Sequence, residues 1–547
     1  MIRNLRRISK HKYFHFYCFA LLIVLWSPMA FFGFHPHHEG LMLATLNLTS
    51  DAIKTGGSYP FNQYGPFWTL PYLTMNLIPL SGFTFLAQRF VSILMIFFSA
   101  IIIRRISLKF YSHNTSLLIS CLFLLTYPYG QPSIIWPSIP AQLALLILTH
   151  SVLLCLDFPH RIYVFIASLA TIFLLGSRIQ IGILSILCTI VILAISRHFL
   201  ALARYVIYTT LCLGFVVLIF LRLDLFEDVL FDSLVFPLTY LDSNQQNWTF
   251  PRTSLAVMIA LIILFLFLNK IRDNRNIIGV PLIIMLTVST GLLFLHFHSQ
   301  ETYLQVYARI YVGFFLFVAS AVFLLTVRNL RQFKTNFPHP GVLWLYCLVG
   351  ATQVFPLFDA FHAWYASAPL IIALPLIFRD TNLVSKLSRN TIVVWVSSLV
   401  FALFTFFSIQ TMQSFANTTK PFPLDEVKGI FLTTQQVSDF ENEFTFLKNN
   451  IPKRSTIMNF CSNADPFFPR GYWPSASRLF VFWPGFSDSP LIEKDLLKAD
   501  FVTSCTSITA LSDTSQRILE ENFSKVGTRL EKSSWGLDWE IYKKNTN

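Results

Sequence analysis

The chain has 547 residues, of which 54% are hydrophobic and 13% are charged. Soluble globular domains carry about 25% charged residues, so this composition excludes an ordinary soluble protein. The net charge of +13 would suit a nucleic-acid-binding protein, but residues 413–547 hold 15 Lys and Arg against 16 Asp and Glu. The basic excess therefore lies in the apolar remainder, in short clusters between hydrophobic runs. This is the positive-inside pattern of a membrane protein and predicts no nucleic-acid partner.

Apolar runs of membrane-spanning length recur through residues 1–412 and predict a polytopic α-helical domain of about 13 transmembrane helices. The first run follows a basic N-terminus without a cleavage site after it, and is interpreted as a retained helix rather than a signal peptide. The basic clusters place the N-terminus in the cytoplasm and the C-terminus outside, provided that the proline-rich segment 66–80 does not cross. The expected spans are 14–34, 83–103, 116–130, 138–157, 162–177, 180–196, 204–221, 253–269, 277–296, 303–326, 341–358, 364–378 and 391–412.

Residues 413–547 have shorter hydrophobic runs and predict a small extracytoplasmic α/β domain. Cys461 and Cys505 each end a predicted strand, so a disulfide can form if these strands are neighbours in a parallel sheet. The chain has no CxxC motif, which argues against a structural zinc site. The predicted elements are helices at 440–450, 491–499 and 516–523, strands at 455–461 and 500–504, and a closing hairpin of 527–530 with 538–543.

The first outside loop carries Glu39 in the segment His35-Pro-His-His-Glu-Gly40, directly after the first apolar run. The leucines that follow predict a short helix on the membrane surface, with Glu39 near its N-terminus. One interpretation of Glu39 is a helix-capping residue, and the other is a general base or metal ligand that faces a cavity. The adjacent His35, His37 and His38 cannot all point at one metal ion and are more often solvated.

Other ionisable residues stand at the predicted outer boundary of the membrane. Asp359 and His362 lie at i and i+3 between two spans, and share one face if this segment is helical. Arg178 lies in a tight outside turn, while Arg89 and Arg309 lie near the outer ends of their spans. A buried cation at this depth needs an anion, which can be either a substrate phosphate or a protein carboxylate.

Four features follow one another along nearly the whole chain. They are the first loop with His38-Glu39-Gly40 and Phe61-Asn-Gln-Tyr-Gly-Pro66, the late motif Pro356…Asp359…His362…Pro369, the number of spans, and the C-terminal α/β region. In this order they resemble the bacterial GT-C superfamily of integral-membrane glycosyltransferases, of the family 39-like type, which use polyprenyl-phosphate-linked sugars.

The resemblance implies a multi-pass glycosyltransferase of the cytoplasmic (inner) membrane that moves a sugar from a polyprenyl-phosphate donor to an acceptor. The transfer would take place on the outer face, and the acceptor would be a lipid glycan, a polymer or a protein. By the same resemblance Glu39 is expected at the reaction centre as general base, with transfer that inverts the anomeric carbon. His38 stands beside it, where many members of the superfamily have an aspartate, and is assigned with Glu39 to the catalytic residues.

The remaining site residues are assigned in two ways. Asp359 and His362 match the late motif of the superfamily and would orient the substrate or acceptor, and Tyr64 lies in the first-loop motif and is assigned to substrate binding. Arg178 and Arg309 are assigned to the leaving phosphate on physical grounds, because they are cations at the outer boundary.

The second outside loop, residues 127–136, lacks the acids that metal-dependent members of the superfamily carry there. We therefore predict transfer without a divalent metal and without another cofactor. Two other functions are compatible with a multi-span chain. A transporter or flippase would be expected to show internal repeats, which are not evident here. A polysaccharide polymerase or ligase of the envelope would carry a long loop between late helices.

Overall fold

The structure is a computed structural model of the chain. It describes the residues in the following ranges: 26–27, 30–34, 38–55, 60–125 except 61, 63, 79 and 81, 135–235, 259, 316, 319–320, 339–354, 364–373, 416–461, 472–477, 490–505, 513–530, 535 and 538–545.

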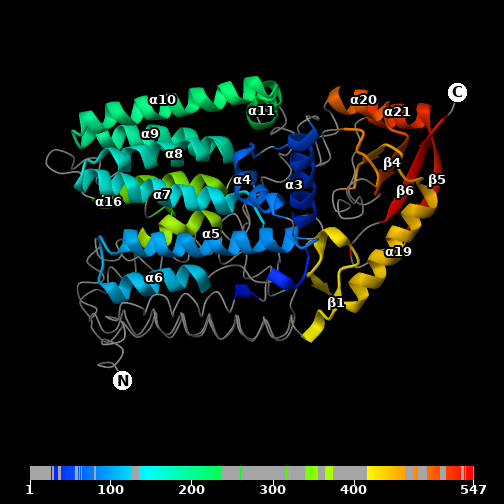
Figure 1. Ribbon diagram of the computed structural model, residues 1–547, viewed down its shortest axis with the longest axis horizontal. Helices are drawn as coiled ribbons and strands as arrows, with labels where there is room; N and C mark the ends of the chain where they lie inside the picture. The colour runs from blue at the N-terminus through cyan, green and yellow to red at the C-terminus, as the bar shows by residue number, and fades with distance from the viewer. Residues whose placement is uncertain are drawn as a thin grey trace.

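Apolar helices form a bundle in the described part of the chain (Figure 1). Three of its helices, α5, α7 and α10, are long and apolar enough to cross a membrane. Helices α7, α8 and α9 begin and end within one residue of the predicted spans 138–157, 162–177 and 180–196, whereas α10 begins five residues before its predicted span 204–221. The bounds are α5 Thr84–Ser107, α6 His113–Leu125, α7 Ser138–Asp157, α8 Arg161–Ser177, α9 Ile179–Ile195, α10 Phe199–Arg222, α16 His339–Ala351 with the turn η6 Thr352–Val354, and a helix Trp364–Ala373.

The predicted number of spans is not tested by these helices. The expected spans at 277–296 and 391–412 lie outside the described residues, those at 253–269 and 303–326 lie outside them almost entirely, and of 14–34 only residues 26–27 and 30–34 are described. The expected span at 341–358 overlaps α16, which begins two residues earlier at His339, ends at Ala351 and continues as the single turn η6.

One end of the bundle is held together by an ionic cluster. Lys109, just after α5, pairs with Asp157 at the end of α7, and His339 at the start of α16 lies 2.5 Å from the other oxygen of Asp157. The sequence placed both Lys109 and Asp157 on the cytoplasmic side, and the structure does bring them to the same end of the bundle.

The segment between the first predicted span and α5 does not run along the bundle. Helix α3, His38–Thr55, lies crosswise to α5 and α7 in Figure 1, between the bundle and the C-terminal region. The following stretch forms only the short turns η1 Phe67–Thr69, α4 Leu70–Leu73 and η2 Thr74–Leu77. The helix expected after Glu39 is confirmed, and the proline-rich segment has no element long enough to span a membrane.

The C-terminal region, residues 413–547, has a mixed sheet with the strand order β3-β4-β6-β5. Strands β3 and β4 are parallel neighbours, while β6 pairs antiparallel with both β4 and β5. The disulfide Cys461–Cys505 joins the ends of β3 and β4, as the parallel arrangement allows. The bounds are β1 Lys420–Pro421, η7 Asp425–Val427, β2 Phe431–Leu432, α19 Thr434–Asn450, β3 Ile457–Asn459, α20 Pro490–Leu496, β4 Phe501–Ser504, α21 Asp513–Asn522, β5 Phe523–Arg529 and β6 Trp539–Lys544.

Several predicted bounds in this region are wrong, among them those of the hairpin strand expected at 527–530, which is β5, Phe523–Arg529. Helix α19 begins at Thr434 rather than at residue 440, because Thr433 and Gln436 form a capping box that satisfies the free N–H groups of the first turn. The strand expected at 455–461 is only three residues long, Ile457–Asn459.

The C-terminal region shares its hydrophobic core with the bundle. One cluster of buried residues extends from α7 and α8 through α3 and α5 to Phe422 and Trp535. Phe34 lies at the junction, with ring centroids 5.2 Å from Phe422 and 6.5 Å from Trp535. The two parts therefore meet through a packed apolar contact close to the start of α3.

Candidate active site

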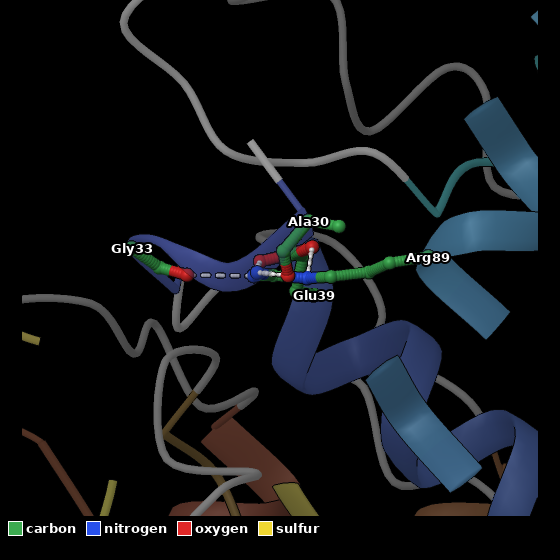
Figure 2. Close-up of polar contacts among 4 residues, drawn as sticks. All are labelled: Ala30, Gly33, Glu39 and Arg89. Atoms are coloured by element: carbon green, nitrogen blue, oxygen red, sulfur yellow. Dashed lines mark hydrogen bonds and ion pairs between the residues drawn. The ribbon is translucent and has the colours of Figure 1, made fainter. Parts of the chain in front are cut away.

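Glu39 forms a fully buried ion pair with Arg89 of α5 (Figure 2). The Nε of Arg89 donates to Oε1 of Glu39 at 3.0 Å, and Nη2 donates to Oε2 at 2.5 Å. The same guanidinium donates to the backbone oxygens of Ala30 at 2.8 Å and Gly33 at 2.7 Å. Four hydrogen bonds thus fix the arginine, and two of them hold the carboxylate in a bidentate arrangement.

This arrangement answers one question that the sequence left open. Arg89 was a candidate for either a phosphate or a protein carboxylate, and its partner is Glu39. A guanidinium suits this position better than an ammonium would, because its rigid fork can serve both oxygens and two carbonyls at once. Removal of either partner would leave a buried charge, which typically costs about 3–5 kcal/mol.

Glu39 also occupies the first turn of α3, where the helix dipole favours a negative charge. Both of its oxygens accept from Arg89, and the side chain has no exposed surface in this structure. His38 is the first residue of α3, and its side chain lies outside the described part of the structure.

Arg178 is the second buried arginine of this end of the molecule, with 3% of its surface exposed. Its Nη2 donates to the hydroxyl of Ser138 at 2.5 Å, and its guanidinium carbon lies 4.6 Å from the ring centroid of Tyr64. Its Nε has no hydrogen-bond partner. Among the described residues Arg178 has no carboxylate partner, and burial lowers the pKa of its guanidinium. The structure therefore brings two predicted site residues together. The ring of Tyr64 lies against the guanidinium of Arg178, whose Nε is an unused donor.

The loop that carries Tyr64 is held by its neighbours. The side-chain oxygen of Asn62 accepts from the indole N–H of Trp68 at 3.0 Å and from the backbone N–H of Tyr64 at 3.2 Å. The backbone N–H of Asn62 in turn donates to Asp232 at 3.0 Å. Asp232 is buried and belongs to the π-helical turn η3, Phe231–Val235.

Gly65 allows this loop to approach α8 closely. It has a positive φ of 85°, and a Cβ at this position would lie 2.5 Å from the backbone oxygen of Gly176. Gly176 stands two residues before Arg178. Close backbone contact at this glycine pair therefore brings Tyr64 over Arg178.

A chain of aromatic and hydroxyl contacts connects the two arginine centres. Trp68, which donates to Asn62, packs edge-on against Tyr72 with ring centroids 5.9 Å apart. The hydroxyl of Tyr72 lies 2.9 Å from that of Ser92. Ser92 follows Arg89 by three residues on α5 and so shares its face of the helix. Both centres consequently lie at the same end of the bundle.

Sequence reasoning missed several residues of this site, and some predicted ones are not described. Ser138 carries no signal in the sequence, and Asn62 lies within the first-loop motif Phe61-Asn-Gln-Tyr-Gly-Pro66 but was assigned no role. Asp232 lies in the predicted outside loop between the spans 204–221 and 253–269. Arg309, Asp359 and His362 lie outside the described residues, as do His35 and His37. In the ranges that the structure describes, no three His, Cys, Asp or Glu side chains are grouped so as to hold a metal ion.

No protein-family model matches this chain, and no curated protein matches it in sequence. Its fold, however, matches solved structures. The apo oligosaccharyltransferase of Archaeoglobus fulgidus aligns with a TM-score of 0.50 and 11% identity, over 98% of this chain and 75% of that one. ArnT from Cupriavidus metallidurans aligns with a TM-score of 0.42 and 12% identity, over 96% of each chain. The arabinofuranosyltransferase AftD from Mycobacteria aligns with a TM-score of 0.41 and 11% identity, over 98% of this chain and 40% of that one.

The likeness to the oligosaccharyltransferase concerns the fold, since the sequences are only 11% identical. It shows that this chain and that oligosaccharyltransferase share a fold. With its long apolar helices the chain is thus a helical membrane protein that carries a C-terminal region of mixed helices and strands.

Proposed function

We propose that this protein is a membrane glycosyltransferase that takes a sugar from a polyprenyl-phosphate donor and passes it to an acceptor at the outer face of the cytoplasmic membrane. The observation that carries the proposal is Arg178. A buried guanidinium with an unused Nε donor, and without a carboxylate among the described residues, is a site for an anion. The phosphate of a lipid-linked sugar is such an anion, and it lies at the depth of the membrane interface.

In the proposed reaction, the oxygen of an acceptor hydroxyl attacks the anomeric carbon while the bond between that carbon and the phosphate oxygen breaks. Polyprenyl phosphate leaves with the bonding electrons, and Arg178 compensates its negative charge. Tyr64 would cover the guanidinium and limit access of water. Arg309, Asp359 and His362 keep their sequence-based roles in this proposal, as phosphate-binding and substrate-orienting residues.

Glu39 would take the proton of the acceptor hydroxyl. A single displacement of this kind inverts the anomeric configuration. Arg89 holds the carboxylate in one orientation through both of its oxygens. Because Glu39 is buried, the acceptor must reach it by displacing a neighbouring group. The reaction is proposed to need no divalent metal.

The C-terminal region is proposed to lie outside the cytoplasm. The disulfide between Cys461 and Cys505 supports this side, since disulfides persist in oxidising compartments. The acceptor is proposed to be a lipid glycan, a polymer or a protein.

The test uses the purified full chain in nanodiscs with a panel of polyprenyl-phosphate sugars and release of polyprenyl phosphate as the readout. Wild-type protein should transfer at least one sugar, and EDTA should leave the rate unchanged. Arg178→Met should raise KM for the donor about 10- to 100-fold, as expected for loss of one charge-assisted hydrogen-bonding group. Arg222→Met is the matched control, because Arg222 is exposed at the end of α10. Equal donor KM for Arg178→Met and wild type would refute the phosphate site.

A further inference from the structure

Arg89 joins three separate pieces of the chain. Its Nη2 is shared, since it donates both to Oε2 of Glu39 and to the backbone oxygen of Gly33. Its Nη1 donates to the backbone oxygen of Ala30. The orientation of the Glu39 carboxylate is thereby tied to the position of the short segment 30–34 (Figure 2).

That short segment is in turn bound to the C-terminal region. The backbone N–H of Gly33 donates to the oxygen of Phe431 at 2.9 Å, and Phe32 forms a parallel bridge with Phe431. Phe34 packs against Phe422. Gly33 therefore receives a hydrogen bond from Arg89 on its carbonyl and donates one to β2 through its N–H.

A second contact places the C-terminal region directly on α5. A Cβ on Gly429, which has a φ of 89°, would lie 2.9 Å from Leu86 and 3.1 Å from Phe83. The ammonium of Lys428 lies 5.1 Å from the ring centroid of Phe83. Leu86 precedes Arg89 by three residues on the same helix, so the contact with Gly429 lies one turn from the ion pair.

We propose that Arg89 is a positioning residue for Glu39, and that docking of the C-terminal region through Gly33 and Gly429 sets the position of this arginine. The part that concerns Glu39 as a reacting group rests on the proposed function. The coupling itself rests on the shared Nη2 and on the two contacts with the C-terminal region. Loss of docking would move Gly33, and the guanidinium would then lose the geometry that holds both carboxylate oxygens.

The first arm of the test changes the arginine. Arg89→Lys keeps the charge, but an ammonium cannot make the same four bonds. Hydrogen exchange of the peptides that cover residues 420–432 should become faster than in wild type. The kcat for sugar transfer should fall by on the order of 100-fold with little change in donor KM, as expected for a misplaced catalytic group. Arg161→Lys, at an exposed position at the start of α8, is the control and should match wild type in both measurements.

The second arm changes the C-terminal side, and stays informative if Arg89→Lys fails to fold. Gly429→Ala should separate the C-terminal region from α5 and speed exchange at residues 30–34 and at the start of α3. Gly214→Ala is the matched control, because nothing lies within 4 Å of a Cβ at Gly214. The coupling is wrong if Gly429→Ala speeds exchange only in its own peptides, or if Arg89→Lys leaves residues 420–432 unchanged.

The two proposals can fail separately. If wild type transfers no sugar from any donor, the proposed function fails, while the exchange measurements still decide the coupling. If transfer is found and Arg89→Lys changes donor KM but not kcat, the arginine does not position Glu39 for the chemical step.

Discussion

At the scale of single residues, the two buried arginines differ in the groups that compensate their positive charge. Arg89 is satisfied by Glu39 and two carbonyls, whereas Arg178 has one hydroxyl partner, an aromatic ring and a free Nε. A buried cation is costly unless an anion approaches it. The first arginine therefore has a structural partner within the chain, and the second is the better candidate for a ligand that arrives with the substrate.

Replacement of Glu39 separates its roles as base and as partner of Arg89. Glu39→Gln should lower kcat by about 100-fold or more, since a general base typically contributes 10²–10⁴-fold. It should also lower thermal stability, because Arg89 would be left buried without its counter-ion. The measurements are the transfer rate and the thermal transition of the same preparation in nanodiscs.

The control for this prediction is Glu39→Asp, which keeps the charge but shortens the side chain. It should recover part of the stability and little of the rate. A Glu39→Gln protein that folds and transfers sugar at the wild-type rate would exclude Glu39 as the base.

At the scale of elements, tight contacts between loops and helices place the site residues. The loop of Tyr64 reaches α8 only because Gly65 and Gly176 let two backbones meet. Helix α3 carries Glu39 across the ends of the spans, and α5 carries Arg89 to it. Small residues at these contacts are therefore as important for the geometry of the site as the polar side chains that they bring together.

We expect Gly65→Ala to disturb the Arg178 centre selectively. The positive φ of 85° and the backbone oxygen 2.5 Å from the new methyl group would force the loop away from Gly176. A strained position of this kind costs about 1–3 kcal/mol. Donor KM should rise while the far end of the bundle stays protected in hydrogen exchange. Gly214→Ala should change neither quantity, and a wild-type donor KM for Gly65→Ala would argue against the role of this contact.

The β5–β6 hairpin contains a pH-dependent contact of its own. Glu540 accepts from Lys525 at 2.5 Å and from the hydroxyl of Tyr542 at 2.7 Å. Burial alone raises the pKa of the Glu540 carboxyl, but these two partners outweigh it, so its pKa lies below the ordinary value. A carboxylate whose pKa is lowered in the folded state stabilises the fold at pH values above its unfolded-state pKa of about 4.3. This stabilisation is lost as the pH falls through the folded-state pKa.

Glu540→Gln should therefore lower the midpoint of thermal unfolding at neutral pH, and the difference from wild type should shrink as the pH falls below about 4. Glu441→Gln, at an exposed position of α19, is the control and should show no such trend. A difference that is independent of pH would show that the carboxylate charge does not contribute.

At the scale of the whole molecule, one apolar core joins the bundle to the C-terminal region. Within that region the disulfide links two parallel strands that are 44 residues apart in the sequence. A closed loop of this length restricts the unfolded chain, which corresponds to about 4 kcal/mol in the chain-entropy model.

The double variant Cys461→Ser/Cys505→Ser should accordingly unfold its C-terminal region at lower denaturant concentration, with a loss of up to about 4 kcal/mol. The measurement is hydrogen exchange of β3 and β4 under increasing urea, compared with wild type with and without reductant. Cys212→Ala, a free cysteine of α10, is the control. Unchanged protection of both strands in the double variant would rule out a stabilising role.

Much of the architecture could be predicted from the sequence because it depends on local patterns. The helix expected at 138–157 matches α7, since its apolar run is bounded by Pro137 and Asp157. The closing hairpin could be predicted from short β-rich runs, although its first strand begins at Phe523 rather than at residue 527, whereas the parallel pairing of β3 and β4 was only a condition for the disulfide. The early start of α19 carried a readable signal, Thr433 with Gln436 three residues later, which the prediction overlooked.

By itself, the sequence determined a membrane bundle, a C-terminal α/β region, and a set of ionisable residues at one boundary. These features are set by hydrophobicity and charge along the chain, which are local properties. Only the tertiary structure decided which charges meet. Arg89 pairs with Glu39 across 50 residues, and Arg178 lies under Tyr64 rather than beside an acid among the described residues. Such pairings depend on how helices are rotated about their axes and on how closely two backbones approach. Glycines such as Gly65 determine how close that approach is.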